Sequence, residues 1–306
     1  MPLLSPPEYS YLRTSLLSEP PIRPDLRSLT AFRPLAAELT LLPTTHGSSR
    51  LFLPDGSECI VGIKPELSAH PSFEVSIEIA GLRDDDPMAV LLAGMVADTI
   101  RAQVHERLRT SGNWSSGAAE GMETAGGAQT RGRPWGWKLY IDVVVVSPPA
   151  SHPGGLVSLA VHLALRDLRL PKLVSAPEED PVFDDDYEAC EWLFPREAGA
   201  GGIPAVREGG KGMNKADTPA VTVLVAAVGD NVLFDPTREE MVVADCVAAV
   251  SVTRDGSVGG LRMLETGSGG ENGGVGRKVV NRIVKEVGVA AGGLFESLDQ
   301  IVRTSI

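Results

Sequence analysis

Two groups of strand-like segments, each followed by helical segments, constrain the fold of this 306-residue chain more than any other feature. An Asp-Gly turn at residues 55–56 separates two apolar stretches, which predicts a hairpin. Residues 74–80 alternate apolar with polar side chains, and this period of two predicts a strand with one buried face. Dense runs of β-branched residues predict further, fully buried strands. The predicted strands cover residues 51–53, 58–63, 74–80, 139–146, 221–228 and 242–252.

Helical segments separate and follow these strands. Ser5, with two prolines after it, and Asp86, with one, are both typical of helix starts. Residues 156–168 are apolar on nearly every side, so we expect that helix to lie between two layers. A last helix is predicted over residues 279–302, interrupted by the Gly-Gly pair at 292–293. Strands followed by helices, twice over, predict an α+β architecture of two similar lobes.

The charge balance limits the kind of partner. Lys and Arg number 28 and Asp and Glu number 40, which gives a net charge of −12. A uniformly basic surface for nucleic acid is therefore excluded, and any contact with RNA or DNA must be a local patch. Aromatic residues are only 5% of the chain, so the core must be mainly aliphatic.

Cysteine usage and the amino terminus indicate a compartment. Cys59, Cys190 and Cys246 are odd in number and scattered, which favours free thiols in a reducing compartment over disulfides or a zinc site. The first 24 residues contain no apolar run of signal-peptide length, and no stretch reaches the roughly 20 apolar residues of a membrane span. We expect a soluble, intracellular protein.

Three segments are predicted to be surface loops, because they cannot bury enough apolar surface to offset their ordering entropy. Residues 110–136 are rich in glycine, and residues 267–276 are more than half glycine. Residues 178–191 hold eight acidic residues and no basic one, and glycine-rich residues 199–212 follow.

Common catalytic patterns are absent from the sequence. It has no G-x-S-x-G string, and the glycines of residues 267–276 fit neither a phosphate loop nor a dinucleotide-binding loop. The five histidines lack metal-ligand spacing. The aspartates at 84–86 are explained by the helix that starts there, and those at 184–186 by a solvated acidic loop. No metal and no cofactor is therefore predicted.

Several short strings occur in an order typical of one family. They are R-P-D-L-R at residues 23–27, G-S-S-R at 47–50, D-G-S-E-C-I-V at 55–61, Y-I-D-V at 140–143, L-P-K at 170–172 and D-P-T-R-E-E at 235–240. On these strings the chain resembles RNase PH-like proteins, most closely the ring subunits of the eukaryotic RNA exosome. Leu26 stands where the family's first string has glycine. The match runs from about Ser10 to the last helix, and the insert-rich style is similar to that of fungal members.

The resemblance implies a fold of two β-α units of the ribosomal protein S5 domain 2 type. It implies an N-terminal helix and arm over residues 1–30 and a second lobe over 219–306. The first lobe is expected over 31–218, with a glycine-rich insert at 110–136 and an acidic and glycine-rich loop at 177–217.

The resemblance also implies a function in RNA processing and degradation, including rRNA processing. The expected role is a non-catalytic structural subunit that holds the exosome ring and lines its RNA channel. Expected partners are five other RNase PH-like subunits, cap subunits of the S1/KH type, an associated exosome nuclease and single-stranded RNA, with no membrane. The expected location is the nucleus and nucleolus, and also the cytoplasm.

Loss of catalysis is expected from two departures from the family pattern. Active members hold inorganic phosphate with an arginine in the turn that corresponds to residues 147–156, and this turn contains no arginine. His152 is the one candidate substitute, and a neutral imidazole is a poor anion clamp. Met241 replaces the first of two family aspartates, so Asp245, which matches the second, is expected to have a structural role.

The resemblance offers two candidate RNA contacts. The archaeal inactive subunit has two helix arginines that face RNA, and Asp98 and Arg101 match them, so Arg101 is the first candidate and Arg83 the second. Two other interpretations stay open: an active phosphate-dependent 3′-to-5′ exoribonuclease, and an unrelated α+β binding module.

Overall fold

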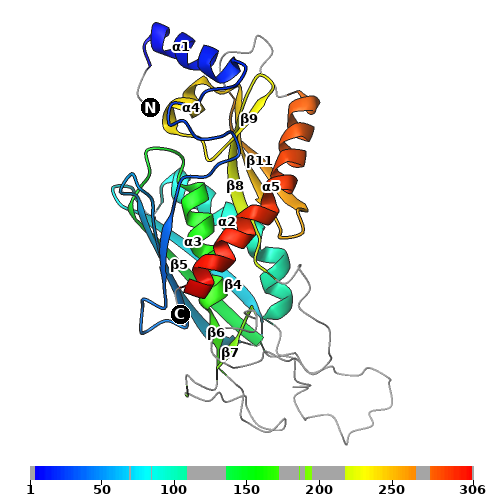
Figure 1. Ribbon diagram of the computed structural model, residues 1–306. Helices are drawn as coiled ribbons and strands as arrows, with labels where there is room; N and C mark the ends of the chain where they lie inside the picture. Colours follow the sequence, from blue (N-terminus) through cyan, green and yellow to red (C-terminus); the bar gives the residue numbers. More distant parts are fainter. Residues whose placement is uncertain are drawn as a thin grey trace, which may run out of the picture.

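A computed structural model describes residues 4–68, 70–83, 85–108, 136–171, 186, 190–194, 218–266 and 276–304. Two β-sheets lie one above the other in the view of Figure 1, with helices between and around them. The architecture is α+β, as the order of strands and helices predicts. Within the described residues, no helix is long and apolar enough to cross a membrane.

The first sheet has five strands in the order β1-β2-β3-β5-β4. The strands are β1 (Ala36–Leu39), β2 (Gly47–Phe52), β3 (Glu58–Ser68), β4 (Ser72–Ile79) and β5 (Gly136–Ser147). All neighbours are antiparallel except β4 and β5, which are parallel and are joined through α2 (Pro87–Arg107). A parallel pair needs such a crossover connection, so the long helix follows from the strand arrangement.

The second sheet has four antiparallel strands in the order β11-β10-β8-β9. These strands are β8 (Val221–Val228), β9 (Asn231–Phe234), β10 (Cys246–Val252) and β11 (Val258–Thr266). Helix α4 (Arg238–Val243) joins β9 to β10, and helix α5 (Arg277–Thr304) follows β11. A two-stranded ladder of β6 (Arg169–Leu170) and β7 (Glu191–Trp192) completes the described sheets.

Helix α3 (Gly154–Asp167) lies between the two sheets and is buried along nearly its whole length. It is hydrogen-bonded to both: Oγ of Ser49 in β2 donates to the Ala160 carbonyl at 2.7 Å, and N–H of Thr222 in β8 donates to Oγ of Ser158 at 2.7 Å. The prediction of a helix between two layers is confirmed. One hydrophobic cluster therefore runs from the first sheet through α3 to the second sheet and α5.

The N-terminal helix α1 (Pro6–Leu17) packs on the second sheet. Leu16 is fully buried in a separate cluster with side chains of β8, β9, α4 and β10. Helix α1 starts with a capping box of Ser5 and Glu8, in which the carboxylate of Glu8 accepts hydrogen bonds from the N–H and the hydroxyl of Ser5. The predicted boundaries at residues 30 and 218 stay predictions, since the hydrophobic cluster crosses from one lobe to the other.

Two predicted elements differ from the structure. Helix α5 continues through Gly292 and Gly293, because the flanking side chains of Ala291, Leu294 and Phe295 are buried and packing outweighs the low helix propensity of glycine. The predicted strand over residues 242–252 begins only at Cys246, because a capping box at Thr237 starts α4, which extends to Val243.

Three residues expected in loops, Gly136, Glu191 and Trp192, lie in strands. Gly136, at the end of the predicted glycine-rich insert, is the first residue of β5, and a Cβ there would lie 2.4 Å from Cγ of Pro71. Its glycine therefore permits a close approach of two chain segments. Trp192, in the predicted loop at 177–217, pairs with Arg169, whose guanidinium lies 4.1 Å from the centre of the indole ring. Of the predicted inserts at 110–136, 177–217 and 267–276, the structure describes only residues 136, 186, 190–194 and 276. The other residues of these inserts lie outside the described residues.

Other predictions from local sequence are confirmed. Asp86 caps α2 by accepting a hydrogen bond from N–H of Met88, whereas Asp84 lies outside the described residues. Cys59 and Cys246 are buried in strands, and burial raises the pKa of the Cys59 thiol to about 12.

Candidate functional site

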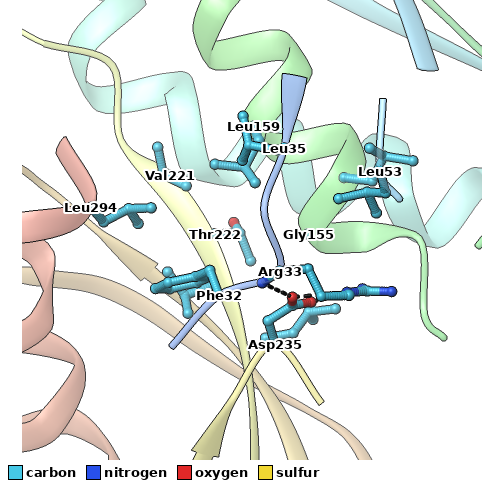
Figure 2. A pocket seen from close by; sticks show the side chains of 13 residues that line it. Phe32, Arg33, Leu35, Leu53, Gly155, Leu159, Val221, Thr222, Asp235 and Leu294 are labelled. Atoms are coloured by element: carbon cyan, nitrogen blue, oxygen red, sulfur yellow. Dashed lines mark hydrogen bonds and ion pairs between the residues drawn. The ribbon is translucent and has the colours of Figure 1, made fainter. Parts of the chain in front are cut away.

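The turn between β5 and α3, where the resemblance expects the phosphate site, lies at the junction of the two sheets. The N-terminal arm and the turn after β9 reach the same place, so that Arg33, Asp235 and Gly155 line one small pocket (Figure 2). The cavity measures about 30 Å³. A space of this size holds about one or two water molecules and not a nucleotide.

Arg33 supplies a guanidinium to this turn from a distant part of the chain. Its Nη2 donates to Oγ of Ser151 at 3.0 Å and to Oδ1 of Asp235 at 2.7 Å, and its Nε donates to Oδ2 of Asp235 at 2.9 Å. Its Nη1 donates to Asp55 at 3.1 Å. Arg33 is not predicted as a site residue from the sequence, because it stands in no motif and the turn itself contains no arginine. Both ends of this guanidinium are already bound to carboxylates.

The electrostatics of the Arg33–Asp235 pair favour the charged forms. Burial alone would lower the pKa of Arg33, but the hydrogen bond and the charge of Asp235 outweigh burial and raise it. Burial alone would raise the pKa of Asp235, but the hydrogen bonds and charges of Arg33 and Arg27 lower it. The two charges therefore neutralise each other where an anion would have to bind.

His152 occupies the start of α3. Its Nδ1 accepts a hydrogen bond from N–H of Gly154 at 3.1 Å, and burial lowers the pKa of the imidazole. Free backbone N–H groups at a helix start are a common anion site, and here one of them is bound by the imidazole. With Nδ1 as an acceptor, the imidazole of His152 is neutral and is bound to the backbone at the start of α3.

Asp245 binds two groups that hold the fold together. Its Oδ1 accepts from Nη2 of Arg13 in α1 at 2.7 Å, and its Oδ2 accepts from N–H of Gly229 at 2.6 Å. The same Arg13 donates from Nη1 to the Val243 carbonyl at 2.8 Å. Asp245 thus connects α1 to the β8–β9 turn, and Arg13 connects α1 to the end of α4, which is a structural role as expected.

Met241 and Glu240 are both buried and contribute to the packing of α4. Met241, in place of a family aspartate, is buried in the cluster that contains Leu16. Glu240 is fully buried and accepts from Nε and Nη2 of Arg23 at 2.8 and 2.7 Å. The R-P-D-L-R and D-P-T-R-E-E strings therefore meet in space, and the pair between Arg23 and Glu240 joins them.

Leu26 has an unusual backbone. Its φ is +61° and its side chain is exposed, with 83% of the residue accessible. Glycine adopts this left-handed region freely, whereas a leucine there is strained. The glycine of the family string is thus explained, and the substitution in this chain carries a local cost.

The G-S-S-R string places β2 against α3. A Cβ on Gly47 would lie 2.8 Å from the Ala164 carbonyl oxygen, so only glycine fits between strand and helix. N–H of Ser48 and the hydroxyl of Thr40 both donate to Asp167 at the end of α3, at 3.1 and 2.9 Å. This string is therefore a packing motif.

The two candidate RNA contacts lie apart. Arg101 is exposed on α2, with 66% of its side chain accessible, and its Nη2 lies 3.8 Å from Oδ1 of Asp98. Asp98 also pairs with Arg262 of β11 at 3.3 Å. Arg83, with 86% of its side chain accessible, pairs with Asp85 before α2 begins. Most of α2 separates the two arginines, a rise of roughly 20 Å, so the structure does not bring them into one site.

Among the residues that the structure describes, no group of three or more His, Cys, Asp or Glu side chains is arranged to hold a metal ion.

Comparisons with solved structures define the class of fold. The chain is similar to a subunit in "archaeoglobus fulgidus exosome with RNA bound to the active site", with a TM-score of 0.60 and 16% identity over 94% of this chain and 96% of that one. It is also similar to rice (Oryza sativa) Rrp46, with a TM-score of 0.56 and 13% identity over 92% of this chain and 100% of that one. The fold is that of the RNase PH-like exosome core subunits, as expected.

Comparisons of sequence define the family. The chain is 34% identical over 252 residues to Exosome complex component RRP42 of Saccharomyces cerevisiae, covering 79% of this chain and 78% of the relative. It is 27% identical over 279 residues to Exosome complex component rrp42 of Schizosaccharomyces pombe, covering 87% and 84%. No protein-family model matches the chain. The chain belongs to the family of exosome complex component RRP42.

Proposed function

We propose that this chain is a non-catalytic structural subunit of the exosome ring, which holds the ring and lines its RNA channel while other components cleave RNA. As a member of the RRP42 family, the chain is a core component in RNA processing and degradation. The observation that carries the non-catalytic role is the state of the β5–α3 turn. There the guanidinium of Arg33 is paired with Asp235, and Nδ1 of His152 accepts a hydrogen bond from the N–H of Gly154, the first residue of α3.

Phosphorolysis needs free positive charge, because the attacking phosphate and the RNA phosphate repel each other. The guanidinium of Arg33 donates to Ser151 of the turn, and it is bidentate to Asp235. A general acid or metal-binding carboxylate is needed as well. Asp245, which matches the second of the two family aspartates, is bound to Arg13 and Gly229. Both Arg33 and Asp245 are thus bound to other parts of the fold.

The alternative function, an active phosphate-dependent exoribonuclease, has one observation in its favour. Arg33 places a guanidinium 3.0 Å from Ser151, which is the combination of residue types that holds phosphate in active members. For phosphate to bind there, Arg33 would have to leave Asp235. Such a break would expose a buried carboxylate, so the non-catalytic role is favoured.

The partners follow from the family. We propose five other RNase PH-like subunits in the ring, S1/KH-type cap subunits, an associated nuclease and single-stranded RNA. The proposed location is the nucleus, the nucleolus and the cytoplasm.

An assay of phosphorolysis tests the absence of catalysis. The purified chain is incubated with single-stranded RNA and inorganic phosphate, and nucleoside diphosphates are measured. We expect none above a no-phosphate control. Phosphate-dependent shortening that Asp245→Ala abolishes would contradict the proposal. Co-purification from cells tests the ring role: we expect a particle several times the mass of the chain, and a free monomer would contradict it.

Arg101 is our proposed RNA contact in the channel, and Arg83 is the second. Both side chains are exposed cations, and Arg101 shares the charge of Asp98 with Arg262. In the assembled ring, Arg101→Glu is expected to reduce RNA crosslinking to this chain, and Arg83→Glu to reduce it less. Lys64→Glu, on an exposed residue of β3, is the control. Unchanged crosslinking in Arg101→Glu would remove the assignment.

A further inference from the structure

The first turns of α5 carry a row of basic side chains. Lys278, Arg282 and Lys285 recur at spacings of four and three residues, so they share one face of the helix. The opposite face contains the buried Ile283 and Val287. Lys278 and Lys285 are exposed, and Arg277 beside them is exposed as well. We call Arg277, Lys278, Arg282 and Lys285 the α5 basic row.

The α5 basic row is unusual for its position in the helix. The start of a helix carries a partial positive charge, which favours acidic residues there. The first turn of α5 contains no acidic residue and begins with Arg277 and Lys278. The row therefore opposes the helix dipole, and it does so in a chain of net charge −12. Folding alone gives no reason for this concentration of cations.

Nearby carboxylates offset only part of this charge. Arg282 pairs with Asp230 of the β8–β9 turn at 2.7 Å. Glu286 follows Lys285, and burial raises the pKa of Glu286 against the effect of Arg282 and Lys285. In the described part of the chain, Arg277, Lys278 and Lys285 form no ion pair within 4.0 Å. The four cations of the row thus exceed the two neighbouring carboxylates, Asp230 and Glu286, by two positive charges.

We propose that the α5 basic row binds the phosphate backbone of RNA, at a site separate from Arg101 and Arg83. The inference rests on the proposed function, since it assumes that RNA passes along this subunit. The row lies beside the second sheet, at the end of α5 that is away from the first sheet (Figure 1). Arg101, by contrast, lies on α2. Contacts of this kind read charge and not base sequence.

An RNA backbone fits the row better than an acidic protein segment. A protein interface needs an apolar centre in addition to charge. Around the row, the exposed apolar side chains in the described part of α5 are Val284 and Val289, which are small and lie on different sides of the helix. A row about 10 Å long with uncompensated cations and little apolar surface is suited to a polyanion held mainly by charge.

Charge reversal tests the proposal with the full-length chain. Binding of a labelled oligouridine is measured by fluorescence anisotropy over a series of salt concentrations. The variant is Lys278→Glu with Lys285→Glu. Its control is Lys64→Glu with Arg238→Glu, which changes the net charge equally and also reverses a cation in the first turn of a helix. Both variants are checked for folding by thermal unfolding.

The α5 variant is expected to bind RNA at least tenfold more weakly than the wild type and the control. The slope of log affinity against log salt should fall by about 1.4, because about 0.7 counterions are released per phosphate contact on single strands and the variant removes two such contacts. Equal weakening in both variants, an unchanged affinity in the α5 variant, or no salt-dependent binding of the wild-type chain at low salt would each overturn the proposal. Binding of an acidic peptide but not of RNA would assign the row to a protein partner.

A second measurement separates this proposal from the ring role. The same α5 variant is purified from cells with its partners. Normal incorporation with weakened RNA binding supports both the ring role and the RNA site. Normal incorporation with unchanged RNA binding overturns only the RNA site, and a wild-type chain that enters no particle contradicts the ring role.

Discussion

Arg33 and Asp235, which are 202 residues apart in the chain, form a two-bond ion pair at the junction of the two lobes. Asp235 also accepts from the backbone N–H of Arg33 at 2.9 Å and from Arg27 at 3.2 Å. One carboxylate thus gathers the N-terminal arm, the β9–α4 turn and, through Arg33, the β5–α3 turn. The pair gives a structural use to the turn where the resemblance implies a phosphate site.

Removing the charge of Asp235 should destabilise the fold. We expect Asp235→Asn to lower the free energy of unfolding by about 2–3 kcal/mol, because it leaves a largely buried guanidinium without its charged partner. Asparagine suits the test, since Asp235 has a φ of +47° and asparagine tolerates that region. Urea denaturation followed by circular dichroism measures the effect. The exposed pair of Arg83 and Asp85 supplies the control, and an equally large loss in Asp85→Asn would refute the special role of Asp235.

The free energy of unfolding should decrease as the pH is lowered, because of His162. This histidine in α3 donates from Nδ1 to the Pro219 carbonyl at 2.9 Å, and burial together with the charge of Arg166 lowers its pKa from 6.5 to about 3. Below pH 6.5 the unfolded chain takes up a proton that the folded chain does not. The stabilisation is therefore complete above pH 6.5 and is lost as the pH falls toward 3.

Between pH 7 and pH 5 the free energy of unfolding should drop by about 2 kcal/mol through this group alone. Denaturant titrations of the wild type and of His162→Gln at several pH values measure it. The variant is expected to lose this part of the pH dependence, whereas His70→Gln, on an exposed residue, should keep it. The same slope in the wild type and His162→Gln would contradict the assignment.

Replacing Leu26 with glycine should stabilise the protein slightly. A leucine in the left-handed region costs about 1–2 kcal/mol, and glycine costs about 0.5–1 kcal/mol through the entropy of the unfolded chain, so the net gain is about 0.5 kcal/mol. Ile22→Gly is the control, because Ile22 is an exposed apolar residue of the same arm without a positive φ. Thermal unfolding should show a higher midpoint for Leu26→Gly and a lower one for Ile22→Gly. A lower midpoint for Leu26→Gly would show that its side chain, and not its backbone, decides.

Asp245 is predicted to stabilise the docking of α1 on the second sheet and to have no catalytic role. Asp245→Asn is expected to weaken the docking of α1 by about 1 kcal/mol, since the pair with Arg13 is partly exposed. Amide hydrogen exchange in α1 should then rise about fivefold, whereas exchange in α3 should not change. Glu239→Gln, on an exposed residue of the D-P-T-R-E-E string, is the control. Unchanged exchange in α1 would mean that its apolar contacts alone hold the helix.

Local patterns predicted much of the fold, because they depend on neighbours in sequence. The cap at Asp86, the alternating strand before it and the buried helix α3 are all signals within a few residues. Helix α5 was predicted with a break, because glycine propensity is also local, whereas the burial of Leu294 and Phe295 depends on the whole fold.

The site was predicted less completely, for the same reason. The loss of the turn arginine and of a family aspartate at Met241 are visible in the sequence. The partner of Asp235 is not, because Arg33 stands in no motif and reaches Asp235 only when both lobes are assembled. The role of His152 depends on which nitrogen faces Gly154, and only the folded turn decides that.

The position of α3 between the two sheets has a consequence for synthesis on the ribosome. When α3 has emerged, the strands of the second sheet that cover its far side have not yet been translated. The nascent chain must therefore keep an almost wholly apolar helix away from other molecules until β8 and β10 arrive, and a protein truncated before residue 218 would expose that surface permanently.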